Sequence, residues 1–385
     1  MNINEPLQLL GGISPKTFMQ RYWHKKPLLI RQAIPGFKPL LERKALFDLA
    51  ARDDVESRLV VQASADGTQP WALHHGPFSR RALPSLKQSG WTVLVQGVDL
   101  LDDSVHALMN QFRFAPDARL DDLMISYATD TGGVGPHYDS YDVFLLQAHG
   151  QRRWRIGKQK DLTLLPDMPV KILANFEPEI EYVLEPGDML YLPPRYCHDG
   201  IAMGECMTYS IGYRVPNRGE LAGELLQRLA EETCDSVGGT LYRDPSQAAM
   251  ENCAEIPDTL VEFAKNSVLA GVQNTTVFHR VLGEYLTEPK NHVQFEAEDS
   301  HSMDMESLLA GDGLVLDRRT RMMFDAKHIF INGEGFVAAG RDATLIRHLA
   351  NERSLTNTEV KRLSIKAREL VLDWYNAGWL HVRGI

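Results

Sequence analysis

The chain has 385 residues, of which 44% are hydrophobic and 24% charged, and its formal net charge is −10 at pH 7. This composition is typical of a globular protein of two or three domains, and the acidic balance argues against direct nucleic-acid binding, which needs clustered lysine and arginine. The sequence contains no long apolar run, and its first residues, Met-Asn-Ile-Asn-Glu, form neither a basic patch nor an apolar stretch, so we expect a cytoplasmic protein without membrane association.

A glycine-rich segment followed by a histidine and an aspartate is the first informative motif. Residues 131–135 read Thr-Gly-Gly-Val-Gly, and His137-Tyr138-Asp139 follows almost at once. Glycine lets the backbone turn sharply or approach a ligand closely, and residues two apart on a strand project to the same side. His137 and Asp139 are therefore predicted to form a two-point metal clamp, with residues 143–146 as a buried strand after it. A chance match of so short a pattern is the alternative.

A second segment supplies a candidate for a third metal ligand. Residues 185–188, Glu-Pro-Gly-Asp, predict a turn, residues 189–192 predict a short buried strand, and Pro193-Pro194 predicts its end. His198 follows just beyond that end. Two histidines and one carboxylate on one face of iron(II) leave positions open for substrate and oxygen, whereas a purely structural histidine is the alternative.

The cysteines give no sign of a further metal site. Cys197, Cys206, Cys234 and Cys253 form no C-x-x-C pair, which argues against a zinc site or a disulfide framework and indicates reduced thiols. Cys197 adjoins His198, but neighbours on an extended segment point apart. We therefore do not expect Cys197 to be a ligand.

Together, the two histidine segments resemble the JmjC class of iron(II) and 2-oxoglutarate dependent oxygenases, whose fold is a double-stranded β-helix, or cupin barrel. The resemblance extends to residues 18–31, 56–59, 75–78 and 121–126. Because the chain continues far past the barrel, its whole length resembles the bacterial ribosomal oxygenases. Those enzymes hydroxylate an arginine at its β-carbon in protein sixteen of the large ribosomal subunit.

The resemblance implies that His137, Asp139 and His198 hold Fe(II), with 2-oxoglutarate and O2 as cosubstrates. Succinate and carbon dioxide would be the co-products, and the protein would contribute positioning and exclusion of water. An aromatic and aliphatic lining would suit this task, and its candidates are Tyr127, Tyr141, Val143 and Trp154. Aromatic residues on strands are also common in ordinary cores.

Residues 151–155, Gln-Arg-Arg-Trp-Arg, open a predicted strand and contain the candidate cation for 2-oxoglutarate. Arg152 occupies the position where related enzymes place a basic residue for the distal carboxylate, and an arginine fork can bind a carboxylate with two hydrogen bonds. Alternation sends Arg153 to the opposite face, so a solvated basic edge fits Arg153 or Arg155 better. Ser126 is a second candidate for that carboxylate, and an ordinary buried serine bonded to backbone is its alternative.

After residue 216 the strand pattern gives way to helical spacing. Leu221, Leu225, Leu226 and Leu229 are spaced as one face of an amphipathic helix, and residues 260–264 and 277–285 continue the helical spacing. This region resembles the helical dimerisation segment of the family. So few helices need a partner surface to bury their apolar face, which predicts a homodimer.

The last part of the chain alternates strands and helices again. Residues 314–316 and 321–324 predict strands, residues 330–337 a hairpin around Asn332-Gly333, and two helices follow, one from near Asp342 and one over 358–376 that Gly378 stops. This looks like a winged-helix module. A basic recognition helix is one interpretation, on Lys361, Arg362, Lys366 and Arg368. Because Glu359, Glu369 and Asp373 dilute that stripe, intrahelical pairing and a scaffold or docking role are favoured.

The sequence thus predicts an α+β multidomain protein, with a JmjC/cupin catalytic domain over residues 1–216, a helical dimerisation domain over 217–295 and a winged-helix-like domain over 296–385. An acidic protein suits a basic partner, here a large-subunit ribosomal protein before assembly, because RNA phosphates would repel this surface. Asp142 and Asp199 are candidates for guiding a cationic side chain, with solvated carboxylates as the alternative.

Two other classes of function remain open from the sequence. The first is another JmjC reaction, such as hydroxylation of a histidine in another ribosomal protein or lysine demethylation. Demethylation is less favoured because the C-terminal region resembles the ribosomal enzymes. The second is a non-catalytic cupin that senses a ligand and binds DNA through its winged helix.

Overall fold

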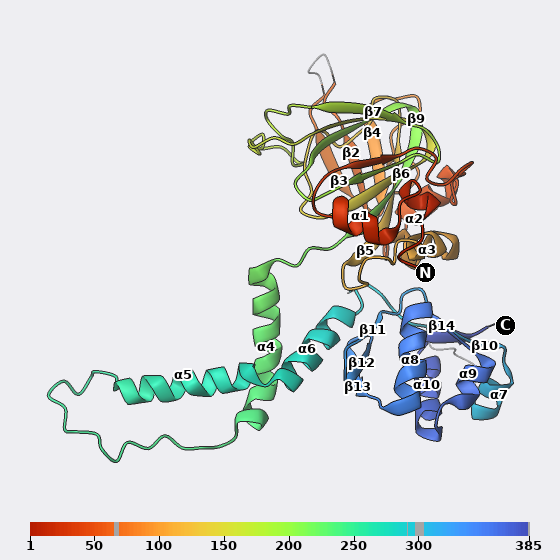
Figure 1. Ribbon diagram of the computed structural model, residues 1–385. Helices are drawn as coiled ribbons and strands as arrows, with labels where there is room; N and C mark the ends of the chain where they lie inside the picture. The colour runs from red at the N-terminus through yellow and green to blue at the C-terminus, as the bar shows by residue number, and fades with distance from the viewer. Residues whose placement is uncertain (65–68, 291, 297–303, 384–385) are drawn as a thin grey trace. The chain divides into compact units, whose positions relative to one another are not determined.

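Figure 1 shows the computed structural model, which describes all residues except 65–68, 291, 297–303 and 384–385, and leaves out the side chains of 234–236. The chain divides into two units, Met1–Val215 and Pro216–Ile385. The first is built on a large sheet and the second on helices with two small sheets, so the predicted α+β multidomain class is confirmed. Within the described parts of the chain, no helix is both long and apolar enough to cross a membrane.

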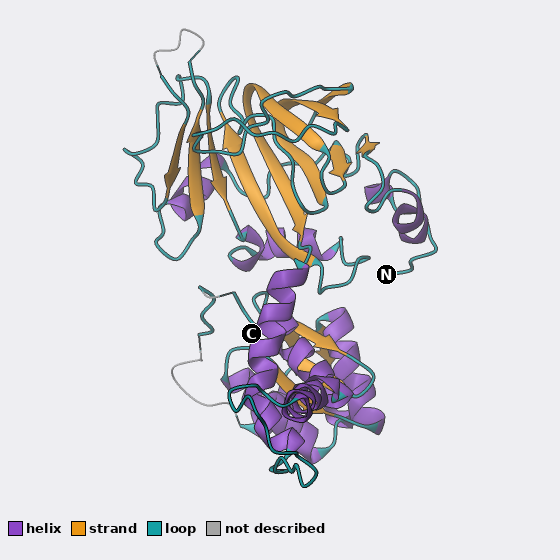
Figure 2. Cartoon of the chain, turned by 90° about the vertical axis from the view of Figure 1, so that its left-hand side faces the viewer, coloured by secondary structure: helices purple, strands orange, loops and turns teal. Residues whose placement is uncertain are grey.

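A nine-stranded antiparallel sheet forms the first unit, and Figure 2 shows it curving around on itself. In spatial order its main path consists of β1 (Leu28–Ile30), β8 (Met189–Leu192), β6 (Val143–Gly157), β9 (Cys197–Tyr213), β5 (Leu120–Ala128), β4 (Trp91–Val95), β2 (Ser57–Val61) and β3 (Ala72–His75). The ninth strand, β7 (Ile180–Leu184), pairs with the second half of β6. This arrangement places β6 and β9, the two longest strands, side by side along the curved wall.

The two faces of this sheet differ because side chains alternate along each strand. One face packs against α1 (Pro15–Arg21), α2 (Arg43–Ala50) and α3 (Asp103–Asn110) in the main core, where Phe18, Leu46 and Leu108 meet Phe144 and Ile125. The 3-10 turns Gln8–Leu10 and Val98–Leu100 complete this covered side. The opposite face, which we call the inner wall, includes Val143, Leu145, Trp154, Ile156 and Leu190.

Side-chain caps fix the ends of the covering helices. The Ser14 hydroxyl accepts a hydrogen bond from the Thr17 amide at the start of α1, where Pro15 is the first helical residue. The Asp102 carboxylate accepts from Ser104 and Val105 at the start of α3. Such caps satisfy backbone donors that have no partner within the helix.

The strands predicted next to the histidine segments are present. Residues 143–146 begin β6, residues 189–192 form β8, and the two pair with each other, as Val143 with Leu192. Residues 185–188 form the predicted turn, in which Gly187 has a φ of 91°. Residues 151–155 do not open a strand of their own, which corrects that prediction. They continue β6 past an irregularity at residues 147–151.

The second unit begins with the three expected helices. They are α4 (Arg218–Val237), α5 (Asp258–Gln273) and α6 (Thr275–Thr287). Leu225 and Leu229 of α4 pack on Val281 of α6 in a small core. The apolar spacing read from the sequence therefore predicted the helices, but Leu226 of the predicted apolar face is 53% exposed.

A compact α+β arrangement follows these helices. Its helices are α7 (Met305–Ala310), α8 (Gly340–Glu352), α9 (Asn357–Arg362) and α10 (Ile365–Asn376). Its strands are β10 (Gly313–Leu316), β11 (Met322–Phe324), β12 (His328–Ile331), β13 (Glu334–Val337), β14 (Ser354–Thr356) and β15 (Leu380–Val382), in two three-stranded sheets ordered β14-β10-β15 and β11-β12-β13. The predicted hairpin is β12–β13, and Asn332 and Gly333 at its turn have φ of 48° and 90°.

The single helix predicted over residues 358–376 is wrong. Two helices stand there, because Thr356 and Glu359 cap α9 reciprocally and Ser364 starts α10 with its own cap. The four basic residues of the possible recognition helix are consequently split between α9 and α10. Arg368 also donates to backbone carbonyls at Leu363 and Lys361, so it serves the local structure.

Candidate metal centre

His137 and Asp139 lie in the loop that joins β5 to β6, residues 129–142, which we call the metal-binding loop. His137 forms an isolated antiparallel bridge with His198, in which each backbone amide donates to the other's carbonyl at 2.9 and 2.8 Å. The backbone is therefore extended at His137, but neither His137 nor Asp139 belongs to a regular strand. His198 is the second residue of β9.

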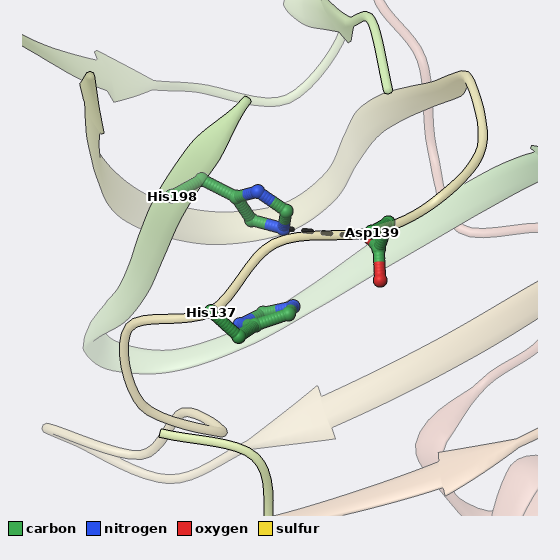
Figure 3. A group of neighbouring side chains, drawn as sticks. All are labelled: His137, Asp139 and His198. Atoms are coloured by element: carbon green, nitrogen blue, oxygen red, sulfur yellow. Dashed lines mark ion pairs between the residues drawn. The ribbon is translucent and has the colours of Figure 1, made fainter. Parts of the chain in front are cut away.

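The three predicted ligands meet at one point (Figure 3). One ligand atom from each of His137, Asp139 and His198 lies within 4.8 Å of the others, and His198 Nε2 is 3.6 Å from Asp139 Oδ2. The two imidazole ring centres are 4.2 Å apart. Two neutral nitrogens and one carboxylate are the donor set that Fe(II) takes in oxygenases of this type, so the residues present fit that ion.

Local hydrogen bonds fix the orientation of both imidazoles. His137 Nδ1 lies 2.8 Å from the Gly135 carbonyl oxygen, and His198 Nδ1 lies 2.9 Å from the Tyr196 carbonyl oxygen. A carbonyl only accepts, so each Nδ1 carries the proton and each Nε2 presents its lone pair.

Burial disfavours the charged form of the His198 imidazole. Burial, with the nearby His137, lowers the pKa of His198 to about 4 although Asp139 opposes this shift. The side chain is consequently neutral at pH 7, as a ligand must be.

The glycine-rich approach is required by close packing. A Cβ on Gly133 would lie 2.4 Å from the Gly200 carbonyl oxygen, and a Cβ on Gly200 would lie 2.6 Å from the Trp154 ring. Gly135 has a φ of 79°, a conformation that favours glycine. The interpretation that glycine permits close backbone approach here is thus supported atom by atom.

Arg152 faces the same side of the sheet as the candidate metal ligand His198. In the antiparallel register Arg152 is opposite Ala202, Trp154 opposite Gly200 and Ile156 opposite His198, and residues opposite each other share a face. The Arg152 side chain is buried, with 6% of the residue exposed, and among the described residues neither its Nε nor its Nη2 has a hydrogen-bond partner. A buried cation with unused donors fits the distal carboxylate of 2-oxoglutarate.

Ser126 also lies on the inner wall, opposite Thr208, which in turn is opposite Gln147 of β6. Its hydroxyl donates to the Thr208 carbonyl oxygen at the long distance of 3.4 Å. The Thr208 hydroxyl donates to Gln147 Oε1 at 3.0 Å. A polar row therefore crosses this part of the wall, and both proposed roles of Ser126 remain compatible with its position.

Of the expected lining residues, Val143 and Trp154 lie on the inner wall, and the Trp154 ring centre is 5.8 Å from that of His198. Tyr141 is 39% exposed beside Asp139. The expectation for Tyr127 is wrong, because it points to the helix-covered face and packs on Phe47 and Trp91.

The two carboxylates considered for guiding a cationic client are not free at the surface. Asp142 is completely buried, and Asp199 is 4% exposed and paired with Arg155. Both the guiding role and the solvated alternative are therefore wrong for these residues. The Arg155 side chain remains 37% exposed in this ion pair, so it stays partly solvated, as predicted for that edge.

Sequence reasoning assigned no role to Arg58, although it lies on the inner wall. Arg58 is opposite Leu94, which is opposite Ser126, and its Nε is buried without a hydrogen-bond partner among the described residues. The alternation of Ser57, Leu59 and Val61 into the main core was the available signal. The barrel thus has a second inward cation besides Arg152.

None of the cysteines whose side chains the structure describes belongs to the centre. Cys197, Cys206 and Cys253 are free thiols, the first two buried. The side chain of Cys234 is outside the described residues. Within the described chain, the group that could hold a metal ion consists of His137, Asp139 and His198 alone.

Comparison with known proteins identifies both halves of the chain. A JmjC domain model matches residues 107–221 and a ROXA-like winged helix model matches residues 270–381. The ribosomal protein uL16 3-hydroxylase of Escherichia coli is 33% identical over 347 residues, which cover 88% of this chain and 89% of that protein.

Solved structures agree. The crystal structure of the Escherichia coli ribosomal oxygenase YcfD superposes with a TM-score of 0.81 at 30% identity, covering 96% of this chain and 98% of that one. The same oxygenase in complex with cobalt and 2-oxoglutarate superposes with a TM-score of 0.76 at 29% identity over the same shares. The expected cupin barrel and winged helix are thereby confirmed.

Proposed function

Because this chain belongs to the ribosomal oxygenases of the JmjC class, we propose that it is an Fe(II) and 2-oxoglutarate dependent hydroxylase of the large-subunit ribosomal protein uL16. Its target is the β-carbon of an arginine side chain. The convergence of His137, Asp139 and His198 inside the barrel carries this proposal.

The residues of the chain divide the work between them. Bound Fe(II) supplies the oxygen chemistry, in which 2-oxoglutarate becomes succinate and carbon dioxide. His137 and His198 would hold the ion through Nε2, and Asp139 would add a carboxylate oxygen and a negative charge. Arg152 binds the distal carboxylate of 2-oxoglutarate through its unused donors. The apolar inner wall around Val143 and Trp154 excludes water.

The overall charge supports a basic client. A net charge of −10 attracts a basic polypeptide and repels RNA, so free uL16 is favoured over the assembled ribosome as the substrate. Such a client supports a cytoplasmic location, because ribosomal proteins are made in the cytoplasm.

Mass spectrometry of uL16 tests this function. Purified uL16 is incubated with the protein, Fe(II), 2-oxoglutarate and oxygen, and its peptides are fragmented. We expect the gain of one oxygen atom on a single arginine, dependent on 2-oxoglutarate. A gain on a histidine of another ribosomal protein would favour the other hydroxylase class. No 2-oxoglutarate turnover together with salt-sensitive duplex binding would favour a DNA-binding sensor.

We also propose that residues 217–295 form a homodimerisation domain. Leu226 of α4 and Val261 and Val268 of α5 are 53%, 51% and 63% exposed, and apolar side chains this accessible on neighbouring helices are typical of an association surface. In light scattering, the unmodified chain should have twice the mass of Val261→Glu/Val268→Glu. Equal masses would contradict the proposal.

The winged-helix-like domain, residues 296–385, is proposed to serve as a scaffold or docking module. Its basic residues Lys361 and Arg362 on α9 and Lys366 and Arg368 on α10 do not form one continuous stripe. Duplex binding that weakens steeply with salt would refute this proposal, because such dependence reports phosphate contacts.

A further inference from the structure

The last residue of the metal-binding loop, Asp142, is a buried acid that has no role in the proposed chemistry. Asp142 is 0% exposed and stands three residues after the ligand Asp139 and directly before β6. Its partner Tyr191 belongs to the main core on the helix-covered face of the sheet. Asp142 therefore holds the loop from the face opposite to the inner wall.

Three side chains from separate parts of the chain converge on the Asp142 carboxylate. The Tyr191 hydroxyl of β8 donates to Oδ1 at 2.5 Å. His24 Nε2, from the segment between α1 and β1, lies 2.8 Å from Oδ2. Arg119 Nη2, just before β5, donates to Oδ2 at 3.3 Å. We call these four residues the Asp142 cluster.

Each partner is itself held by a second contact. The His24 amide donates to the Tyr191 hydroxyl at 2.9 Å. Arg119 Nε donates to the Arg214 carbonyl oxygen at 2.5 Å, and its guanidinium lies 5.5 Å from the centre of the Trp23 ring. The carboxylate consequently sits in a fixed frame.

Backbone contacts connect this frame to the ligands. The Tyr213 amide donates to the Asp142 carbonyl oxygen at 3.0 Å, and the Arg195 amide donates to the Asp139 carbonyl oxygen at 2.7 Å. The far end of the loop is held by the bridge between His137 and His198. Asp139 thus lies between two fixed points of the loop, the bridge at His137 and the contacts of Asp142.

A buried carboxylate is costly unless it is paired, and apolar residues of the same volume usually stabilise as well. Unlike apolar packing, ionic hydrogen bonds require one particular arrangement of the groups that form them. Burial raises the pKa of Asp142, while Tyr191, His24 and Arg119 act in the opposite direction. On balance the pKa of Asp142 stays above its ordinary value, so the three partners offset only part of the effect of burial.

We propose that Asp142 is a positioning residue, which through His24, Arg119 and Tyr191 sets the metal-binding loop so that Asp139 meets the two histidines. This inference rests on the proposed metal centre, and it assigns to the N-terminal segment a part in metal binding.

Metal affinity without turnover tests the proposal. The metal-free full-length protein and Asp142→Asn are titrated with Co(II) alone, and absorbance reports binding. Loss of residues that orient metal ligands typically weakens affinity about 10-fold to 100-fold, and we expect a weakening in that range. Asp188→Asn is the matched control, because Asp188 is also buried and paired with an arginine, Arg31 at 2.6 Å, but lies in the turn before β8.

The outcomes separate this proposal from the metal centre itself. If the unmodified chain bound no Co(II), the metal centre and the positioning role would fall together. Unchanged affinity in Asp142→Asn, or an equal loss in Asp188→Asn, would overturn the positioning role alone. Should Asp142→Asn not fold, His24→Ala replaces it under the same criteria, since the His24 side chain is 41% exposed.

Discussion

Replacing Arg152 should weaken the binding of 2-oxoglutarate and stabilise the protein that has no cosubstrate bound. Each hydrogen bond between charged groups contributes about 1.5–3 kcal/mol net, so losing a bidentate pair costs roughly 3–6 kcal/mol. At 1.4 kcal/mol per factor of ten, Arg152→Met should raise the dissociation constant of 2-oxoglutarate at least about 100-fold. Arg153→Met is the control, because Arg153 points to the opposite face of the sheet. This substitution should change the dissociation constant of 2-oxoglutarate by no more than about twofold, since surface substitutions away from a site have small effects.

The same substitution should have the opposite effect on stability when no cosubstrate is bound. Arg152 is 6% exposed with two donors that lack partners among the described residues, and an unpaired buried charge is costly. Arg152→Met should therefore raise the free energy of unfolding of the cosubstrate-free protein by about 1 kcal/mol or more.

Two measurements decide this prediction. Competition binding gives the dissociation constant of 2-oxoglutarate, and denaturant unfolding gives the stability. Equal weakening of 2-oxoglutarate binding in the Arg152 and Arg153 variants would refute the assignment of the cation. A destabilised Arg152→Met protein would show that the guanidinium has structural partners instead.

Three further predictions concern the loop and the second unit. His137→Ala removes one of the three proposed ligands and should abolish iron-dependent 2-oxoglutarate decarboxylation. Normal succinate formation by this variant would refute the assignment of the three ligands. Gly133→Ala brings a Cβ to 2.4 Å from a carbonyl oxygen and should lower stability by about 1–3 kcal/mol, whereas Gly223→Ala in α4, with open space around it, should stabilise by up to about 1 kcal/mol; equal effects would refute the packing argument. Burial raises the pKa of Asp317, but hydrogen bonds from His381 and Arg319 outweigh it and hold this pKa well below its usual range. Because a depressed pKa stabilises above the unfolded value of about 4 and that stability is lost as pH falls, Asp317→Asn should flatten the decline in unfolding free energy below about pH 5, and an unchanged slope would contradict the assignment.

The convergence of the three proposed metal ligands was predictable because local signals determine their positions. The glycines before His137, the turn at residues 185–188 and the diproline before His198 each restrict the backbone within a few residues. The hairpin at Asn332-Gly333 and the three helices after residue 217 were predictable for the same reason. In each case the residues that carry the pattern also form the element.

The errors concern residues whose state depends on distant partners. Asp142 looked like a surface carboxylate, and its burial depends on His24, which is 118 residues away. Tyr127 was assigned to the lining although its partners Phe47 and Trp91 lie on the other face. The break between α9 and α10 had a local signal, the cap at Ser364, but continuous helical spacing concealed it.

The hydrogen bonds that orient His137 and His198 have an evolutionary consequence. Each imidazole is aligned by the carbonyl two residues before it in its own segment, Gly135 for one and Tyr196 for the other. Among the described residues, neither of these two Nδ1 hydrogen bonds uses a side chain elsewhere in the barrel. Mutations that reshape the entrance for a new client can therefore accumulate without rotating these two rings, so that one oxidation chemistry can be inherited while the choice of client diverges.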